Sequence, residues 1–395
     1  MKDRLPPRLM TSDAGSFAQF TIVERKPQII RQVIEDNRYP AEIEDALQTF
    51  QEEIARRPVR PLQGSGPGIR RWNREWAAHR GRTWLELPWY FAETYFYRRL
   101  LEAVRYFEPG IWLSHDPSGA QKRIQEAEGL EWLRDRWPQL SPGTGHLAFE
   151  PLLHACLWGN RADLSNYTVE EGLRAGAAMG DEQHNVLIDH TSVVSNFLSA
   201  GVERVDIVAD NAGRELMLDL LLAGFLLDEG WAGIVRFHLK NHPFFVSDSM
   251  RYDAQQTLQA LTSLPAAEGL VGHMASGKLE LLENEFWTSC LMFSQMPAAL
   301  ADDLALTDLV VIKGDVNYRR LIGDRHWPHA TRLEKLAECF PSSLLAMRTL
   351  KSEIMVGLEP GQAEELAAED PTWLINGKRG IIQLVEKTTN RREIP

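Results

Sequence analysis

The spacing of apolar residues differs between the first third of the chain and the remainder. Residues 28–58 and 83–107 carry apolar positions at helical spacing, with no strand-like alternation between them. From residue 151 onward, short aliphatic runs alternate with helical stretches. The strand-like runs span residues 205–210, 233–239, 309–315, 343–349 and 380–386. Apolar strands that alternate with helices are typical of sheets covered on both faces, so the pattern predicts an α/β fold, a three-layer α/β/α sandwich with a mostly parallel, Rossmann-like sheet.

These two patterns predict a chain organised in two parts. Residues 1–150 form a mainly helical N-terminal region that packs on the core, and residues 151–395 form the α/β/α core. A length of 395 residues fits one large domain with an added helical part. The segment PVRPLQGSGPG, residues 58–68, is interpreted as a linker, because it lacks the Gly-Lys-Ser/Thr of a phosphate-binding loop.

Composition argues against several classes of partner. A net charge of −12 disfavours binding to nucleic acid or to an anionic membrane surface, since phosphate contacts dominate such affinity. The three cysteines form no Cys-x-x-Cys pair, which indicates a reducing compartment and no cysteine-built zinc site. The N-terminal residues MKDRLPPRLMTSD lack the apolar stretch of a signal peptide. The longest apolar run, around residues 216–227, is too short to span a bilayer. We therefore expect a cytoplasmic protein, and the sequence leaves its oligomeric state open.

Polar residues follow four of the predicted strands. Asp210 and Asn211 end the first strand, and Asp248 follows the second. The third strand leads into KGDVNYRR, residues 313–320, and the fourth into RTLK, residues 348–351. Ligands of open α/β sheets bind at the carboxyl ends of the strands, so these four segments are predicted to form one site.

The residue types at these strand ends favour a divalent metal and a phosphoryl group. Asp210, Asn211 and Asp248 offer two carboxylates and an amide oxygen, which are hard ligands suited to Mg²⁺ or Mn²⁺. Basic side chains would neutralise a phosphoryl group whose oxygens also touch the ion, namely Arg319, Arg320 and Lys351. The small residues Ala212 and Gly213 would let backbone N–H groups at the start of the next helix approach an anion.

Each of these features also has an ordinary structural explanation. Asp-Asn before a helix is a common N-cap pair, a lone Asp248 is typical of a turn, and KGDVNYRR could be a solvated loop. Their joint position after successive strands favours the site. The aromatic stretch at residues 84–107 is interpreted as a buried helix, although Glu93, Arg98 and Arg99 would allow one face of it to border a cleft.

Six segments of the chain together resemble one known family. They are PWYFAETYFYRR (88–99), LWGNRADLS (157–165), VADNAGRE (208–215), FFVSD (244–248), KGDVNYRRL (313–321) and RTLK (348–351). In this order they resemble the metal-dependent damage-control phosphatases, formerly a domain of unknown function. The branch is the one once described as an acidic-residue, or protein-glutamate, methyltransferase with an RTxK motif. DNAGxE combined with KGDxNYR and RTxK is specific, and the resemblance covers nearly the whole chain.

The resemblance implies a metal-dependent phosphomonoester hydrolase. Its cofactor would be Mn²⁺, Co²⁺ or Mg²⁺, held by residues matching Asp210, Asn211 and Asp248. Substrate contacts are implied for Asp210, Asn211, Glu215, Asp315, Asn317, Tyr318, Arg319 and Lys351. Members of this branch hydrolyse small phosphate esters, notably fructose 1-phosphate and fructose 6-phosphate, in metabolite damage control. Two departures, Arg214 within DNAGxE and Val316 within KGDxNYR, remove no ligand, but Arg214 could alter the preference at the pocket rim.

We predict that Asp210, Asp248 and Lys351 carry the catalysis. Lys351 and Arg319 would donate to the phosphoryl group, and Asp315 and Asn317 would bind sugar hydroxyls or orient neighbouring donors. A loose phosphoryl-transfer transition state needs positioning and charge neutralisation, and we favour direct attack by water over attack by a carboxylate.

Two other functions compete with hydrolysis. An S-adenosylmethionine-dependent protein carboxyl (glutamate) methyltransferase usually has a glycine-rich turn after its first strand, whereas ADNAGRE contains one glycine. A non-catalytic binding module would keep the fold and show no metal-dependent turnover. Phosphate release and methyl transfer measured on one sample would distinguish these functions.

Overall fold

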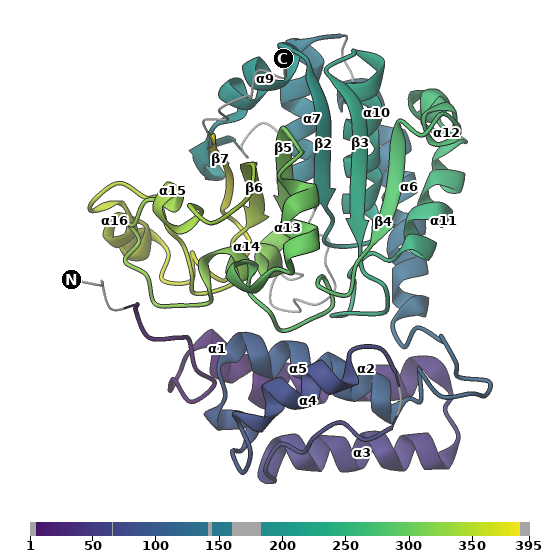
Figure 1. Ribbon diagram of the computed structural model, residues 1–395, viewed down its shortest axis with the longest axis vertical. Helices are drawn as coiled ribbons and strands as arrows, with labels where there is room; N and C mark the ends of the chain where they lie inside the picture. Colours follow the sequence, from purple (N-terminus) through teal and green to yellow (C-terminus); the bar gives the residue numbers. More distant parts are fainter. Residues whose placement is uncertain (1–4, 65, 141–143, 160–182, 388–395) are drawn as a thin grey trace.

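The computed structural model describes residues 5–64, 66–140, 144–159 and 183–387. Within these ranges the chain forms a seven-stranded sheet in the order β1-β7-β6-β5-β2-β3-β4, drawn in Figure 1. All neighbouring strands are parallel except β6 and β7, which are antiparallel. The strands are β1 (Val186–Asp189), β2 (Val202–Val208), β3 (Ala232–Leu239), β4 (Leu279–Glu283), β5 (Leu309–Lys313), β6 (Ser343–Thr349) and β7 (Gly380–Val385). The predicted α/β fold with a mostly parallel sheet is confirmed.

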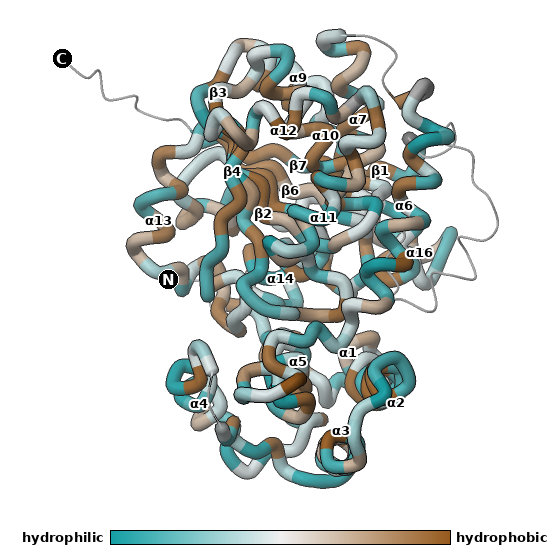
Figure 2. Tube along the Cα trace, turned by 90° about the vertical axis from the view of Figure 1, so that its right-hand side faces the viewer, coloured by the Kyte–Doolittle hydropathy of each residue, from teal (hydrophilic) through white to brown (hydrophobic). Residues whose placement is uncertain are grey.

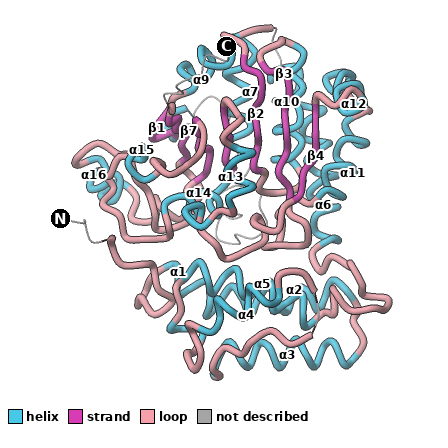
Figure 3. The backbone as a smooth tube through the Cα atoms, viewed as in Figure 1, coloured by secondary structure: helices cyan, strands magenta, loops and turns pink. Residues whose placement is uncertain are grey.

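Helices cover both faces of this sheet, as Figure 3 shows. One face packs against α6 (Gly119–Leu140), α7 (His146–Gly159), α9 (Thr191–Ser199), α10 (Arg214–Asp228), α11 (Arg251–Leu261) and α12 (Glu268–Ala275). The other face packs against α13 (Ala298–Leu304), α14 (Gly314–Ile322), α15 (Leu333–Leu336) and α16 (Gln362–Glu369). Because successive residues of a strand point to opposite faces, Ile207 joins the first cluster and Val208 joins the second.

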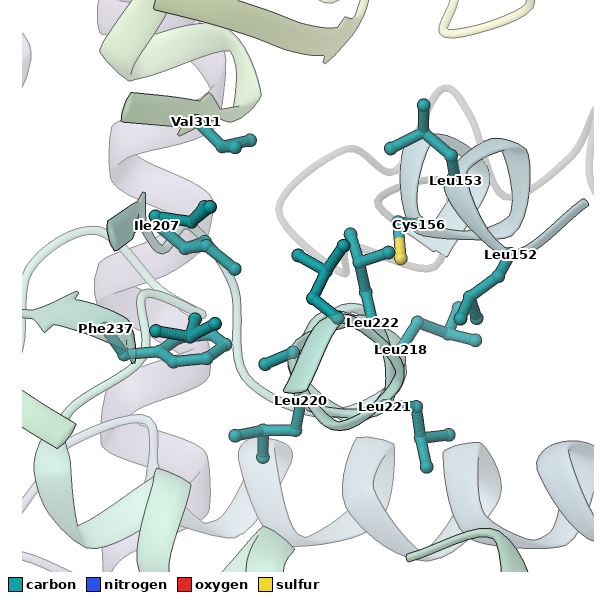
Figure 4. Packing of buried hydrophobic residues seen from close by; sticks show 14 of the residues in the cluster. Leu152, Leu153, Cys156, Ile207, Leu218, Leu220, Leu221, Leu222, Phe237 and Val311 are labelled. Carbon is teal, nitrogen blue, oxygen red and sulfur yellow. The ribbon is translucent and has the colours of Figure 1, made fainter. Parts of the chain in front are cut away.

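Helix α10 is apolar on nearly every side because it is enclosed. It packs against α6, α7, α11, α12 and β3. Figure 4 shows its leucines, among them Leu218 and Leu222, between the sheet residues Ile207 and Val311 and the α7 residue Cys156. A helix that buries all of its faces needs no polar stripe, which explains the sequence LMLDLLLAGFLL. Full burial of each leucine stabilises the fold by about 1.5–3 kcal/mol relative to an exposed position.

A separate helical layer lies beyond the carboxyl ends of the strands, at the bottom of Figure 1. It contains α1 (Phe17–Phe20), a π-helical turn (Thr21–Arg25), α2 (Lys26–Asn37), α3 (Ala41–Arg56), α4 (Ile69–Ala77) and α5 (Trp89–Ala103). Figure 2 shows α5 in the middle of this layer, and its residues from Trp89 to Leu101 are buried. The aromatic stretch is thus a buried helix, as the sequence predicts.

Several boundaries differ from the prediction. The single helical stretch expected at residues 28–58 is divided where Arg38 adopts a left-handed φ of 48° and Pro40 caps the next helix. The edge strands β1 and β4 were not predicted, because edge strands are short and their apolar pattern is weak. Helix α6 and the start of α7 pack on the sheet, and Leu9, Phe17 and Trp89 join the cluster on its other face, so the boundary at 150 stays a prediction. In the ranges given above, no helix is long and apolar enough to cross a bilayer.

Candidate active site

The site lies at the switch point of the sheet. From β2 the chain continues to β3 and β4 on one side, while β5 and β6 lie on the other side of β2. In open α/β sheets the crevice at such a point is the usual ligand site. The four segments that follow β2, β3, β5 and β6 all reach one cavity there, and they contribute Asp210, Asn211, Asp248, Asp315, Arg319 and Lys351.

This cavity has a volume of about 560 Å³ including its opening to solvent. Its cationic lining residues are Arg25, Lys26, Arg319 and Lys351, and its acidic ones are Glu93, Asp210, Asp248 and Asp315. The remaining lining residues are Phe17, Trp89, Tyr97, Asn211, Phe245, Ser247 and Val316. The balance of charges in this lining suits a ligand that has both an anionic group and hydroxyl groups.

Backbone pairing brings the three proposed metal ligands together. Residues 210–212 run antiparallel to residues 247–249, with Asn211 opposite Asp248. The Ser249 N–H donates to the Asp210 carbonyl at 2.8 Å, and the Ala212 N–H donates to the Ser247 carbonyl at 2.7 Å. The predicted use of Ala212 and Gly213 in anion binding is therefore wrong for the Ala212 N–H, because that group already has an acceptor.

Gly213 has a packing role instead. Its φ of +73° is left-handed, and an added Cβ would lie 3.0 Å from Cβ of Gln125 in α6. Glycine at this position lets α6 approach the start of α10 closely. The DNAG turn is consequently shaped by its contact with a neighbouring helix.

Side-chain hydrogen bonds orient Asn211. Its Nδ2 donates to Asp210 Oδ2 and to Glu215 Oε2, both at 2.9 Å, and its Oδ1 accepts from Ser247 Oγ at 2.6 Å. Lys240 Nζ lies 3.2 Å from Asp248 Oδ2 and donates to the Ala209 carbonyl at 3.0 Å. These bonds tie the segments after β2 and β3 to one another.

This donor set fits a divalent cation. Two carboxylates from different strand ends and an amide oxygen line the same cavity, and all three are hard oxygen donors. Across the residues with defined placement, no group of three or more His, Cys, Asp and Glu side chains could hold a metal. A metal here would therefore rely on the Asn211 amide as its third protein ligand.

A buried network supports Asn211 from behind. Lys313 Nζ lies 2.7 Å from Asp219 Oδ1, 3.5 Å from Glu215 Oε1 and 2.7 Å from the carbonyl of Cys156. Burial raises the pKa of Asp219 to about 6, although the ion pair with Lys313 opposes this rise. Glu215 thus contacts Asn211 and does not line the cavity. The sequence analysis expected it to contact substrate, whereas the structure shows it bonded to a proposed metal ligand.

The segment after β6 is joined to the start of α14. Asp315 Oδ1 accepts from Ser352 Oγ at 2.8 Å and lies 3.1 Å from Nη2 of Arg348. Arg348 is itself buried over the ring of Tyr318, at 4.4 Å from the ring centroid. These contacts fix Asp315 beside Lys351 in the cavity wall.

Arg319 is held rigidly in the wall of the cavity. Its guanidinium stacks on Trp89 at 3.4 Å from the ring centroid, Nε donates to Asp324 at 2.8 Å, and Nη1 donates to Glu93 at 2.5 Å. Among the described residues, no atom accepts a hydrogen bond from Nη2. A buried donor of this kind in a cavity wall suits an oxygen atom of an anionic ligand.

Some predicted site residues point elsewhere. Asn317 donates to the Lys313 carbonyl, and the Tyr318 hydroxyl contacts the backbone of Val356, so neither lines the cavity. The predicted phosphoryl contact of Arg320 is wrong, because Arg320 binds the Tyr90 hydroxyl and three backbone carbonyls.

Arg214 does not form the pocket rim either. Its guanidinium lies 4.8 Å from the ring centroid of Trp132 in α6. From the motif LWGNRADLS, residues 160–165 lie outside the described residues. Arg98 and Arg99 are absent from the cavity lining, whereas Glu93 borders it.

The helical layer contributes residues that the sequence analysis did not identify. Trp89, Glu93 and Tyr97 follow one another at intervals of four residues, which places them on one face of α5. That spacing was available in the sequence as a signal. Arg25 and Lys26 lie at the end of the π-helical turn, and no motif in the sequence marks them.

The topology and the cavity define the class of this protein. It is a doubly wound α/β protein with a polar ligand site of mixed charge at the carboxyl ends of its strands, closed from the other side by a helical layer.

Comparisons with known proteins agree with this class. Residues 21–366 match the family model of the damage-control phosphatase ARMT1-like domain. The chain is 32% identical to damage-control phosphatase ARMT1 of Danio rerio, over 96% of this chain and 97% of that protein, and 30% identical to its Homo sapiens counterpart, over 96% and 98%. A crystal structure of a DUF89 family protein from Pyrococcus horikoshii shares the fold, with a TM-score of 0.51 and 12% identity over 93% of this chain and 96% of that one. The chain belongs to the ARMT1-like damage-control phosphatase family.

Proposed function

We propose that the protein is a metal-dependent phosphatase that hydrolyses small phosphate esters, with sugar phosphates such as fructose 1-phosphate and fructose 6-phosphate as its substrates. The observation that supports this most directly is a single cavity lined by Asp210, Asn211 and Asp248 together with Arg319 and Lys351. The name of the relatives, damage-control phosphatase, is in accord with this proposal.

In the proposed mechanism the residues of this chain position and neutralise the phosphoryl group. A divalent cation held by Asp210, Asn211 and Asp248 would supply charge neutralisation at a phosphoryl oxygen. Arg319 Nη2 and Lys351 donate to the other phosphoryl oxygens, where charge is spread in a loose transition state. Trp89 and Glu93 hold the guanidinium of Arg319 in place, so little reorganisation is needed during the reaction.

Water attacks the phosphorus in this proposal, the ester P–O bond breaks, and the leaving alcohol oxygen takes up a proton. Asp210 Oδ2 already accepts a hydrogen bond from Asn211, and Asp248 Oδ2 is paired with Lys240. These contacts support direct attack by water over attack by either carboxylate. Isolation of a phosphoryl-aspartate from the reaction mixture would overturn this order of events.

The function is tested by measuring phosphate release from a panel of esters with Mn²⁺, Co²⁺ and Mg²⁺ in turn. We expect turnover of fructose 1-phosphate and fructose 6-phosphate that disappears with a chelator and returns when the metal is restored. Methyl transfer from S-adenosylmethionine, measured on the same sample, is expected to be absent. Release of phosphate at the same rate after complete metal removal would contradict the proposal.

Lys351→Ala is expected to weaken phosphate binding. Loss of one charge-assisted hydrogen bond to a phosphoryl oxygen corresponds to about a 10- to 100-fold increase in KM and in the inhibition constant of inorganic phosphate. The matched control is Lys278→Ala, which removes the same charge from an exposed position before β4. An unchanged KM in Lys351→Ala would remove this residue from the site.

A further inference from the structure

The helical layer forms the wall of the cavity that faces the strand ends. Phe17, Arg25 and Lys26 come from the continuous helix at residues 17–37, and Trp89, Glu93 and Tyr97 come from α5. On the sheet side, Asp315 lines the cavity, whereas Asn317 donates to the Lys313 carbonyl outside it. The helical layer therefore supplies further polar groups for the organic part of a ligand.

Lys26 is a buried cation whose ammonium group has more N–H donors than it has described acceptors. Its side chain is 2% exposed, and Nζ donates to Glu93 Oε1 at 3.0 Å. The rings of Tyr97, Phe96 and Phe245 lie around Nζ, with centroids at 4.7, 5.2 and 5.9 Å. An ammonium group carries three N–H donors, and the structure shows one hydrogen bond from Lys26 to a described residue. Because Lys26 also lines the cavity, its remaining donors can serve a ligand there.

Glu93 links Lys26 to the phosphoryl-binding residue Arg319. Its Oε1 accepts from Lys26 and its Oε2 accepts from Arg319 Nη1. Burial raises the pKa of Glu93, but the charges of Lys26 and Arg319 outweigh burial and hold this pKa at about 2. The carboxylate is therefore ionised at neutral pH, and each oxygen keeps a lone pair that can accept from a ligand hydroxyl.

Two irregular backbone features occur at this wall. The helix at residues 17–37 contains a π-helical turn at Thr21–Arg25, immediately before Lys26. Phe245, whose ring flanks Lys26, has a left-handed φ of +53°, which is unusual for a bulky residue. Turns and strained residues of these kinds are concentrated at ligand sites, where the surrounding structure maintains them.

Resting on the phosphatase function proposed above, we propose that Lys26 and Glu93 form a hydroxyl-binding pair that selects phosphate esters of polyhydroxylated, sugar-like alcohols. Lys26 donates to an oxygen of the organic part, and Glu93 accepts from a neighbouring hydroxyl. The phosphoryl group is held by Lys351, the metal ligands and Arg319, whose Nη1 also donates to Glu93. The pair therefore decides which alcohol is accepted, and the residues at the strand ends perform the hydrolysis.

The test compares two esters in one enzyme preparation. Fructose 1-phosphate carries hydroxyl groups, whereas p-nitrophenyl phosphate carries a flat apolar ring. Lys26→Met removes the charge and the donors while keeping a side chain of similar length. The ratio of kcat/KM for fructose 1-phosphate to kcat/KM for p-nitrophenyl phosphate is expected to fall about 10- to 100-fold. Lys26→Gln keeps an amide donor, so its kcat/KM ratio is expected to lie between the ratios of Lys26→Met and the wild type.

Glu53→Gln is the matched control for disturbance of the helical layer. Glu53 is also buried, and it pairs with Arg99 of α5 at 2.8 Å, away from the cavity. The kcat/KM ratio of Glu53→Gln for the two esters is expected to equal that of the wild type. An equal loss of kcat/KM for both esters in Lys26→Met would overturn the hydroxyl-binding pair and leave the phosphatase function standing. The same fall of the kcat/KM ratio in Glu53→Gln would have the same consequence. Hydrolysis of neither ester by the wild type would refute the phosphatase function, and the pair with it.

The pH dependence of the same ratio gives a second readout. Burial, together with the charges of Arg25 and Arg319, lowers the pKa of Lys26 to about 8, although Glu93 opposes this shift. Among the described residues, the charges that act on Lys26 come from Arg25 on its own helix, Glu93 on α5 and Arg319 on α14. Because Lys26 loses its positive charge as the pH rises through 8, the wild-type ratio is expected to decline above pH 8. The same decline in Lys26→Met would contradict the proposal.

Discussion

Asp210→Asn and Asp248→Asn are each expected to reduce kcat/KM for phosphate esters by on the order of 10³-fold or more. Both carboxylates line the cavity beside Asn211, and a metal there would contribute several kcal/mol of charge stabilisation to the transition state. The substitutions keep the shape of the side chain, so the fold is expected to persist. Steady-state kinetics with Mn²⁺ measures the loss of activity. Calorimetric titration of Mn²⁺ into each variant measures the loss of metal affinity.

Asp206→Asn is the matched control for these variants. Asp206 lies in β2, four residues before Asp210, and it is fully buried. Its partners are Arg204, His238 and Thr307, away from the cavity. The control is expected to lower the melting temperature and to leave Mn²⁺ affinity and kcat/KM unchanged. If Asp210→Asn or Asp248→Asn retained most of the Mn²⁺-dependent activity, the proposed metal site would be misplaced.

Gly314→Ala is expected to inactivate the enzyme through Asp210. An added Cβ would lie 1.8 Å from Asp210 Oδ2 and 2.2 Å from its Cγ, so the carboxylate must move by more than 1 Å. A displacement of that size in a catalytic group costs about 100-fold in rate. Gly314 also has a φ of +80°, where alanine costs about 1–2 kcal/mol of stability. Kinetics and thermal unfolding of the purified variant measure the two effects separately.

Gly201→Ala separates the collision from the backbone strain. Gly201 precedes β2 and has a φ of +83°, close to that of Gly314, but nothing lies within 4 Å of an added Cβ. Both variants are expected to lose the stability that backbone strain costs, whereas only Gly314→Ala is expected to lose activity and Mn²⁺ affinity. Full activity in Gly314→Ala would show that the position of the Asp210 carboxylate does not matter for hydrolysis.

The carboxyl ends of the central strands could be located from the sequence with little ambiguity. Five strands are recognisable in the sequence as apolar runs, namely β2, β3, β5, β6 and β7. Polar residues follow the first four of these strands. In a parallel sheet those ends meet at one edge, so the meeting of Asp210, Asp248 and Lys351 in one cavity follows from local pattern and topology. The edge strands β1 and β4 lacked such a pattern, because they are short and only partly buried.

Which face of each helix meets the cavity depended on packing that the sequence does not encode locally. Arg319 and Arg320 are neighbours in KGDVNYRR, yet Arg319 lines the cavity and Arg320 binds backbone carbonyls around residues 286–289. Successive helical residues point roughly 100° apart, so the orientation of α14 on the sheet selects one arginine over the other. Lys26 and Glu93 reach the same cavity because the helical layer closes over the strand ends, a contact between segments that are far apart in the chain.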